Sequence, residues 1–513
     1  MNGAEALIAT LIDADVNVCF ANPGTSEMQL VAAIDKLDGM RAILCLFEGV
    51  VTGAADGYGR MADKPAATLL HLGPGLANGL ANLHNAKRAH SPIVNIVGDH
   101  ATYHLNYDAP LTSDVAGVAR PMSDWVGASA SADALAAEGS AAVAAALDYP
   151  GRIATLIAPA NHAWEETKSR AKPVSRKPAP RAAASAVRAA EQALKKGDAA
   201  LFLGGRALRA DALDEAGRIV AATGSRLICE TFFARMERGA GRVAPERLPY
   251  FAEMATENLK GVRRLIMVGA KPPVAFFAYP GKPGWLAPQD ADIVTLAGPR
   301  EDALGALSAL AEELGAPKDH GRAQTPFAPP IGTGKLDAAG IGAVVANLLP
   351  ANAVVSDEAA TAGLALFPMT AGAAPHDWLT LTGGSIGQGL PVGLGAAVAC
   401  PDRKVVCLQA DGGAMYTIQA LWTMAREKLD VATVIVNNGS YAILNIEFMR
   451  VGAGAAGPKA RQLLDLTNPG LDFVSMARGM GVPGRRATTV EEFRDAFAEA
   501  IACKGPFLVD AVI

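Results

Sequence analysis

The sequence lacks the features that mark membrane, exported or nucleic-acid-binding proteins. No apolar run approaches the roughly eighteen residues of a membrane span, and no basic segment precedes an apolar stretch at the N-terminus. The net charge is −5, and no basic cluster with interleaved aromatic residues is present. We therefore expect a cytoplasmic protein with neither a membrane nor a nucleic-acid partner.

Cysteine and charged residues are also scarce. The six cysteines are scattered, mostly inside apolar runs, so they do not form a disulfide framework or a zinc site. Only 19% of the residues are charged whereas 50% are hydrophobic, which indicates a well-buried globular protein. A chain of 513 residues is too long for one hydrophobic core, and three domains of ordinary size are expected.

Helix-period and strand-like segments alternate through most of the chain, a pattern typical of doubly wound parallel sheets. Two stretches rich in proline, glycine or basic residues, 168–181 and 322–334, interrupt this alternation and are interpreted as linkers. The predicted fold class is therefore α/β, with three doubly wound parallel-sheet domains. Their predicted limits are 1–167, 182–320 and 336–513.

The most informative stretch runs from Gln409 to Glu447. An apolar strand leads into Asp411-Gly412-Gly413, whose glycines would let the backbone approach a ligand closely. A second predicted strand, Val431 to Val436, is followed by Asn437 and Asn438, and Asn438 lies 27 residues after Asp411. Both polar groups then lie at the carboxyl edge of neighbouring strands, where doubly wound sheets bind ligands. Their oxygens suit Mg²⁺ shared with a phosphate, although an isolated Asp-Gly pair is most often a plain turn.

A second candidate is Glu48, which stands at the start of a predicted helix beside Phe47, Val50 and Val51. A carboxylate at this position can serve the helix dipole alone. Burial among these apolar neighbours would instead raise its pKa and let it share a proton with a ligand nitrogen. The residues by themselves leave both interpretations open.

Both stretches resemble motifs of the thiamine diphosphate-dependent enzymes. Asp411 to Asn438 resembles the signature Gly-Asp-Gly followed by Asn-Asn, with Ala410 in place of the first glycine. The run from Glu48 to Arg60 is similar to the pyrimidine-domain motif, whose glutamate hydrogen-bonds the aminopyrimidine N1′ and promotes deprotonation at thiazolium C2. The resemblance implies thiamine diphosphate and Mg²⁺ as cofactors, with the metal held by Asp411, Asn438 and the Ser440 carbonyl.

The resemblance covers nearly the whole chain and points to the branch that holds the acetolactate synthase large subunit and benzoylformate decarboxylase. In that branch a bulky residue between glycines wedges the cofactor into a bent form. Ile386 would be the wedge, and the Gly384 carbonyl would face the 4′-amino group. Because family active sites combine two subunits, a homodimer or homotetramer with the active site at the subunit interface is implied.

The resemblance says less about the substrate beyond its being a small 2-oxo acid. His71 and Ser26 match the histidine and serine that benzoylformate decarboxylase uses around its substrate, but that enzyme's second histidine has no counterpart in 273–279. The segment 107–123 is closer to acetolactate synthase, although the lysine that follows in that family is missing. FAD is not expected, because the central domain lacks the glycine- and arginine-rich pattern of the FAD-binding synthases.

Leu444 stands where pyruvate decarboxylases carry a proton-donating glutamate, which favours carboligation. We therefore expect a carboligase that decarboxylates a 2-oxo acid and transfers the acyl-anion equivalent to an acceptor carbonyl, as acetolactate synthase does. One alternative is a simple decarboxylase of a larger, aromatic 2-oxo acid. Another is a non-catalytic cofactor-binding homologue. The remaining loop histidines are expected to be solvent-facing or structural: His100, His104 and His376.

Overall fold

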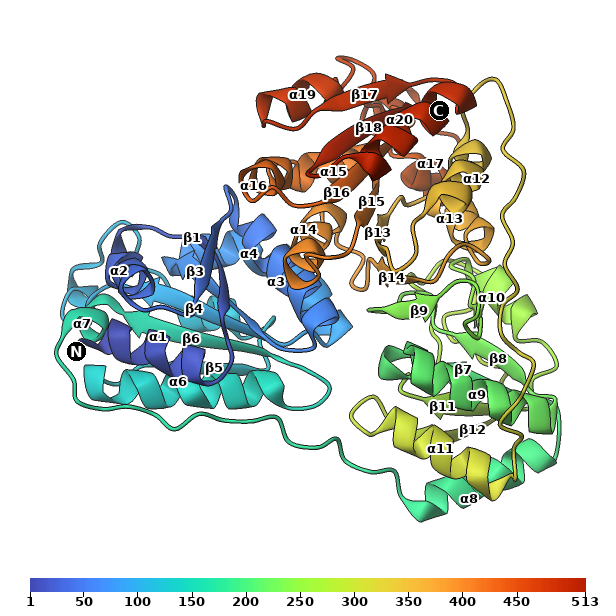
Figure 1. Ribbon diagram of the computed structural model, residues 1–513, viewed down its shortest axis with the longest axis horizontal. Helices are drawn as coiled ribbons and strands as arrows, with labels where there is room; N and C mark the ends of the chain where they lie inside the picture. Colours follow the sequence, from blue (N-terminus) through green and yellow to red (C-terminus); the bar gives the residue numbers. More distant parts are fainter.

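Three sheets organise the chain, and the computed structural model describes all of it, residues 1–513 (Figure 1). Each sheet is built from parallel strands, with a single antiparallel pairing at one edge of the third. Helices cover the sheets, as expected for parallel strands that are buried on both faces. The predicted α/β class is confirmed. No helix is both long enough and apolar enough to cross a membrane.

The first sheet has the strand order β2-β1-β3-β4-β6-β5. Its strands are short apolar runs, such as β3, whose first five residues are all buried. Strand bounds are β1 (Val18–Asn22), β2 (Arg41–Leu44), β3 (Ala66–His71), β4 (Ile93–Asp99), β5 (Trp125–Ala128) and β6 (Ile153–Pro159). The helices are α1 (Gly3–Asp13), α2 (Met28–Lys36), α3 (Glu48–Ala62), α4 (Leu72–Ala89), α5 (Val115–Ala119), α6 (Ala132–Leu147) and α7 (Ala160–Trp164).

The central sheet has five strands in the order β10-β8-β7-β11-β12. Its strand bounds are β7 (Ala199–Leu203), β8 (Arg226–Cys229), β10 (Glu246–Arg247), β11 (Arg264–Val268) and β12 (Asp292–Ala297). The helices around it are α8 (Ala184–Lys195), α9 (Ala210–Thr223), α10 (Ala252–Asn258) and α11 (Ala303–Glu313). An extended segment, 168–183, connects this unit to the first, as the linker prediction requires.

The third sheet has the order β17-β18-β16-β15-β13-β14-β9. Its own strands are β13 (Val354–Glu358), β14 (His376–Thr380), β15 (Val405–Ala410), β16 (Val431–Asn437), β17 (Gly484–Ala487) and β18 (Phe507–Val512). The helices that bear on the site are α14 (Gly389–Ala399), α15 (Asp411–Thr417), α16 (Ala420–Arg426) and α17 (Ala442–Arg450). The remaining helices are α12 (Ala338–Leu348), α13 (Gly363–Met369), α18 (Pro458–Gln462), α19 (Phe473–Gly479) and α20 (Val490–Ala502).

One strand of the third sheet comes from elsewhere in the chain. β9 (Met236–Arg238) follows β8 of the central sheet, yet it pairs antiparallel with β14. The residues between 182 and 320 therefore contribute to two sheets. The predicted limits place Met236–Arg238 in the central domain and do not anticipate that this strand pairs in the third sheet. The domain limits themselves remain predictions.

The first and third units meet where α3 packs against α14 (Figure 1). Glycines allow the two helix backbones to come very close. A Cβ atom on Gly57 would lie 2.0 Å from the Val392 carbonyl oxygen, and one on Gly395 would lie 1.8 Å from the Ala54 carbonyl oxygen. This contact brings the loops at the ends of β2 and β14 to the same region of the molecule.

Candidate active site

The carboxyl edge of the third sheet brings Asp411 and Asn438 together. Asp411 is the first residue of α15, directly after β15, and its Oδ2 atom accepts hydrogen bonds from the backbone N–H groups of Asn438 (3.1 Å) and Gly439 (2.8 Å). The Asn438 Oδ1 atom accepts one from the Ser440 N–H group at 2.9 Å. The structure thus places the residues of the predicted metal site at adjacent strand ends, because β15 and β16 are paired.

The Asp411 carboxylate has backbone donors but no cationic partner. It is 2% exposed, and burial raises its pKa, while N–H groups of Gly412, Gly439, Asn438 and Ser440 act in the opposite direction. No ion pair joins it to a lysine, arginine or histidine, and no group of three or more His, Cys, Asp or Glu residues surrounds it. A buried carboxylate beside an amide oxygen fits a hard cation that takes its other ligands from a diphosphate and water.

Gly412 and Gly413 are sites of close packing within the protein, and their role in cofactor binding remains a prediction. They lie in the first turn of α15, and a Cβ atom on Gly412 would come within 2.4 Å of the Tyr441 ring. One on Gly413 would lie 2.3 Å from Glu358 Oε1. These glycines are required because protein groups pack closely against them, and the expected open turn is instead the start of a helix.

The loop between β14 and α14 carries Ile386, which is half-buried. Gly384 has φ +75° and Gly387 has φ +93°, both in the left-handed region that favours glycine. A Cβ atom on Gly384 would lie 2.3 Å from the Phe276 ring of the central unit. The glycines that flank Ile386 are therefore needed for the loop's backbone conformation and for the close approach of Phe276.

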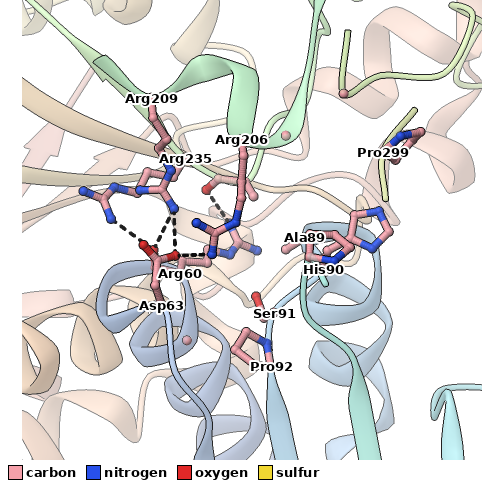
Figure 2. A pocket seen from close by; sticks show the side chains of 15 residues that line it. Arg60, Asp63, Ala89, His90, Ser91, Pro92, Arg206, Arg209, Arg235 and Pro299 are labelled. Atoms are coloured by element: carbon pink, nitrogen blue, oxygen red, sulfur yellow. Dashed lines mark hydrogen bonds and ion pairs between the residues drawn. The ribbon is translucent and has the colours of Figure 1, made fainter. Parts of the chain in front are cut away.

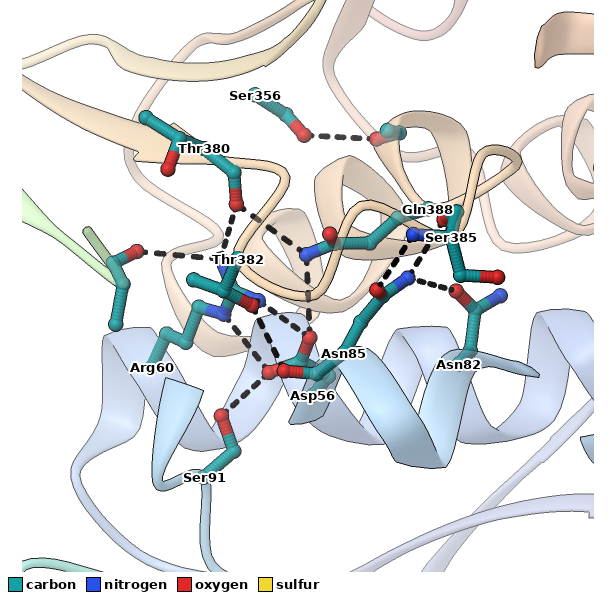
Figure 3. A network of polar contacts seen from close by, with 12 residues as sticks. Asp56, Arg60, Asn82, Asn85, Ser91, Ser356, Thr380, Thr382, Ser385 and Gln388 are labelled. Carbon is teal, nitrogen blue, oxygen red and sulfur yellow. Dashed lines mark hydrogen bonds and ion pairs between the residues drawn. The ribbon is translucent and has the colours of Figure 1, made fainter. Parts of the chain in front are cut away.

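Side chains of α4 hold this loop from one side (Figure 3). Asn85 accepts from the Ser385 N–H group at 3.1 Å and donates to the Ser385 carbonyl at 2.8 Å. Asn82 Nδ2 donates both to the Gly387 carbonyl (3.3 Å) and to the Gly49 carbonyl (2.8 Å). One asparagine thus joins the loop that carries Ile386 to the first turn of α3.

Glu48 begins α3 and is half-buried within the chain. The Asn78 side chain donates to its Oε2 atom at 3.0 Å. Since Asn78 and Asn82 are one turn apart on α4, the same helix contacts Glu48 and the loop of Ile386. The structure therefore places Glu48 and the loop that carries Ile386 beside the asparagine side chains of the same helix, α4.

His71 and Ser26 lie together, and a third residue that the sequence interpretation missed organises them. Glu27 is fully buried, and its carboxylate contacts His71 Nδ1 at 2.8 Å and accepts from the Ser26 hydroxyl at 2.6 Å. Ser26 Oγ and His71 Nδ1 are 3.2 Å apart. The sequence signal was weak, because a glutamate at the third position of a helix is often a capping residue. Glu27 also has that role, through the Gly24 N–H group (2.7 Å).

Comparison with known proteins identifies the group to which these residues belong. Residues 1–118 match the N-terminal TPP binding domain of thiamine pyrophosphate enzymes, and residues 363–511 match the C-terminal TPP binding domain. The "Putative acetolactate synthase large subunit IlvX" of Mycobacterium tuberculosis is 54% identical over 516 residues, which cover 100% of this chain and 99% of that protein. The chain belongs to the thiamine pyrophosphate enzymes. The resemblance seen in the sequence is confirmed.

Other relatives define the branch. A benzoylformate decarboxylase of Pseudomonas aeruginosa is 29% identical and covers 96% of this chain and 95% of its own. The solved structure of a 4-hydroxybenzoylformate decarboxylase of Rhodococcus jostii RHA1 superposes with a TM-score of 0.86 at 24% identity, covering 99% of this chain and 98% of its own. That likeness shows the shared fold. The protein is a thiamine pyrophosphate enzyme of the acetolactate synthase and benzoylformate decarboxylase group.

In this thiamine pyrophosphate enzyme His100 and His104 lie in an exposed loop, whereas His376 lies in the core. The His100 and His104 rings lie 5.5 Å apart, centroid to centroid, and the His104 and Tyr107 rings lie 5.6 Å apart. His376 is 4% exposed, its Nδ1 atom lies 2.7 Å from the Ala374 carbonyl oxygen, and burial lowers its pKa to about 3. It is therefore a neutral structural residue of β14.

A hollow lies between the first and central units, and arginine side chains line it (Figure 2). Arg206 and Arg209 both contact the Asp63 carboxylate, at 2.8 and 3.2 Å. Arg235 Nε contacts Asp377 Oδ1 at 2.5 Å. These arginines are already paired, and none of the cofactor-site residues lies among those lining the hollow. The thiamine pyrophosphate enzyme uses this cluster to join its domains.

Proposed function

We propose that the protein uses thiamine diphosphate with Mg²⁺ to decarboxylate a 2-oxo acid and to transfer the acyl-anion equivalent to an acceptor carbonyl. The identity of 54% to an acetolactate synthase-like relative over the whole chain supports this class of reaction. The proposal of a transfer step depends on one observation, the apolar character of α17, the helix after Asn438.

In this proposal the third sheet holds the cofactor. Asp411, the Asn438 side chain and the Ser440 carbonyl would bind Mg²⁺ on the diphosphate, because they are oxygen donors without a competing cation. The Gly384 carbonyl would accept from the 4′-amino group, and Ile386 would support the bent form between the rings. When bound, thiamine diphosphate supplies a carbon nucleophile and an electron sink for loss of the carboxyl group.

Side chains at the carboxyl edge of the first sheet would bind the substrate and exchange protons with it and with the cofactor. Glu48, with its Oε2 atom held by Asn78, would share a proton with the aminopyrimidine N1′. His71 would bind or protonate the substrate's oxygen atoms, since Glu27 fixes the ring through Nδ1 and leaves Nε2 for a ligand. Ser26 would hydrogen-bond the substrate from the same side.

Leu444 of α17 is the residue that favours transfer over simple decarboxylation. It is 46% exposed and offers no proton. The acidic residue one turn further along α17, Glu447, is 9% exposed and lies 3.4 Å from Arg450, so it is already paired. Without an exposed acid on this helix, the acyl-anion equivalent would be protonated more slowly, which leaves time for a second carbonyl compound to react.

A second function is favoured by the aromatic residues of the central unit. Phe276 lies against Gly384 and belongs to a cluster with Phe232, Tyr250 and Phe277, at centroid distances of 5.4, 5.7 and 4.9 Å. Phe276 keeps 41% of its surface exposed in the single chain. An aromatic wall of this kind beside Gly384 would suit a decarboxylase of an aromatic 2-oxo acid.

Incubation with a panel of 2-oxo acids, followed by mass spectrometry, tests both functions. Carboligation predicts acyloin products such as 2-hydroxy-3-oxo acids, whereas simple decarboxylation predicts the free aldehyde. Removal of Mg²⁺ by a chelator should release the cofactor, and its return should restore binding. If no 2-oxo acid is consumed although cofactor binds, the protein is a non-catalytic homologue and the proposal is wrong.

We further propose a cytoplasmic homodimer or homotetramer in which the site of one subunit is completed by its partner. The apolar side chains exposed near the sheet edges support this, notably Leu46 (47%), Tyr416 (53%) and Tyr107 (75%). Light scattering of the purified protein measures the assembly. A monomer that keeps full activity would contradict it.

A further inference from the structure

The loop that carries Ile386 is held on its inner side by a carboxylate to which neither the motifs nor the comparisons assign a role. Glu358 is the last residue of β13 and is 3% exposed. Its Oε1 atom accepts from the Gly387 N–H group at 2.7 Å, and its Oε2 atom accepts from the Gly389 N–H group at 2.5 Å. Each carboxylate oxygen thus holds one end of the turn from the loop into α14.

The same carboxylate contacts the segment that leads to Asp411. The side chain of Gln409, two residues before Asp411, packs beside Glu358, because a Cβ atom on Gly413 would meet both groups. A Cβ atom on Gly413 would lie 2.3 Å from Glu358 Oε1, so the two groups are packed against each other. Glu358 is therefore positioned between the loop of Ile386 and the helix that begins with Asp411.

Glu358 has no cationic partner that would explain its burial as an ion pair. No salt bridge includes it, and its contacts are backbone N–H groups and the Gln409 side chain. Burying a carboxylate in this way is costly unless its hydrogen bonds are needed. An apolar side chain of similar size would leave two buried N–H groups of the loop without partners.

We propose that Glu358 is a positioning residue that fixes the Gly383–Gly387 loop in the conformation that receives the aminopyrimidine end of thiamine diphosphate. It holds Gly387 and Gly389 from the inside, while Asn82 and Asn85 hold the loop from α4. The loop is then ordered before the cofactor binds. This inference rests on the proposed roles of Gly384 and Ile386.

The first test is Glu358→Gln, which keeps the size of the side chain but places an NH₂ donor against one of the two N–H groups. We expect the dissociation constant of thiamine diphosphate, measured in Mg²⁺ by tryptophan fluorescence, to rise about tenfold or more. Exchange of the C2 proton of bound cofactor, measured by NMR, should slow as well. Melting of the cofactor-free protein shows whether the variant is folded.

Asp357→Asn is the matched control. Asp357 is the preceding residue of β13, is also buried, and accepts from the Trp378 indole N–H group at 3.1 Å on the other side of the sheet. Its replacement should leave the cofactor's dissociation constant unchanged. If Glu358→Gln behaves in the same way, Glu358 is a structural residue only and the inference is wrong.

Ile386→Ala separates this inference from the proposed cofactor site. If Ile386→Ala weakens cofactor binding but a folded Glu358→Gln does not, the Glu358 inference alone fails. If neither variant changes binding or C2 exchange, the proposed roles of Gly384 and Ile386 are wrong, and the Glu358 inference is wrong with them.

The wild-type protein provides a test that needs no variant. Hydrogen–deuterium exchange of the cofactor-free enzyme should show the peptide spanning 383–389 protected, because Glu358 already holds the Gly387 and Gly389 amides. Rapid exchange of these amides that becomes slow only after thiamine diphosphate is added would overturn the proposal.

Discussion

The first and third sheets share one strand order, yet their equivalent strand ends carry different chemistry. With the strands of each unit numbered along the chain, both sheets run 2-1-3-4-6-5. The second strand leads to Glu48 in the first sheet and to the loop of Ile386 in the third. The third strand leads to His71 in one and Asp411 in the other. The first sheet thus carries a glutamate and a histidine at these two strand ends, whereas the third carries a glycine-rich loop and an aspartate.

The first strands extend the comparison, because each is followed by a buried carboxylate. Glu27 follows β1 and holds His71, whereas Glu358 ends β13 and holds the backbone of the neighbouring loop. In the first sheet the carboxylate orients a side chain that can react. In the third it orients main-chain groups that can only bind. We infer that activation of the cofactor and its binding can be disrupted separately, sheet by sheet.

The largest expected effect comes from the third sheet. Asp411→Asn removes the one carboxylate of the proposed Mg²⁺ site, so cofactor affinity should fall by about 100-fold or more. Fluorescence titration with thiamine diphosphate in Mg²⁺ measures this. His71→Ala, at the equivalent strand end of the first sheet, is the control and should keep wild-type affinity. Equal loss in both variants would contradict the division between the sheets.

The next effect comes from the first sheet and should leave binding intact. Glu48→Gln removes the acidic proton while preserving the hydrogen-bonding shape, so C2 exchange of bound thiamine diphosphate should slow by about 100-fold or more. Proton NMR after acid quenching gives the rate. Exchange at the wild-type rate would show that Glu48 has no part in activation.

A smaller effect is expected from Glu27→Gln. His71 loses the carboxylate that fixes its Nδ1 atom, so kcat should fall about tenfold. Cofactor affinity should stay the same. Ser26→Ala keeps the Glu27–His71 contact and should therefore have the weaker effect. A Glu27→Gln variant with unchanged kcat would assign Glu27 to helix capping alone.

The smallest effect concerns stability without cofactor. Burial raises the pKa of Asp411, so the folded protein binds this proton more tightly than the unfolded chain does. The resulting stabilisation is present below the unfolded pKa and is lost as the pH rises through the folded pKa. Cofactor-free Asp411→Asn should therefore melt slightly above wild type at neutral pH, with the difference vanishing towards about pH 4. Calorimetry at both pH values checks this, and a lower melting point at neutral pH would contradict it.

The fold class and the main strands could be predicted from the sequence because parallel strands buried on both faces are continuous apolar runs. Val431–Val436 is such a run, and its end placed Asn438 at the sheet edge. The alternation of strands and helices also predicted that Asp411 would lie beside Asn438. These inferences need only local pattern and the geometry of parallel sheets.

The buried carboxylates could not be predicted in the same way. Glu27 and Glu358 look like ordinary polar residues, since their partners lie up to 44 residues away in the chain. The close packing at Gly413 was not predicted for the same reason, because the group that excludes a side chain there belongs to Glu358. The neighbours of these residues are set by tertiary packing, and a short stretch of sequence does not reveal which residues will pack together.

The position of β9 has a practical consequence for dissecting the protein. Met236–Arg238 covers the outer edge of β14, whose backbone groups would otherwise be free to pair with another strand. A fragment comprising 336–513 alone would expose that edge in every copy. Such fragments should self-associate through β14 in solution, whereas a fragment that begins before Met236 keeps its own edge protected.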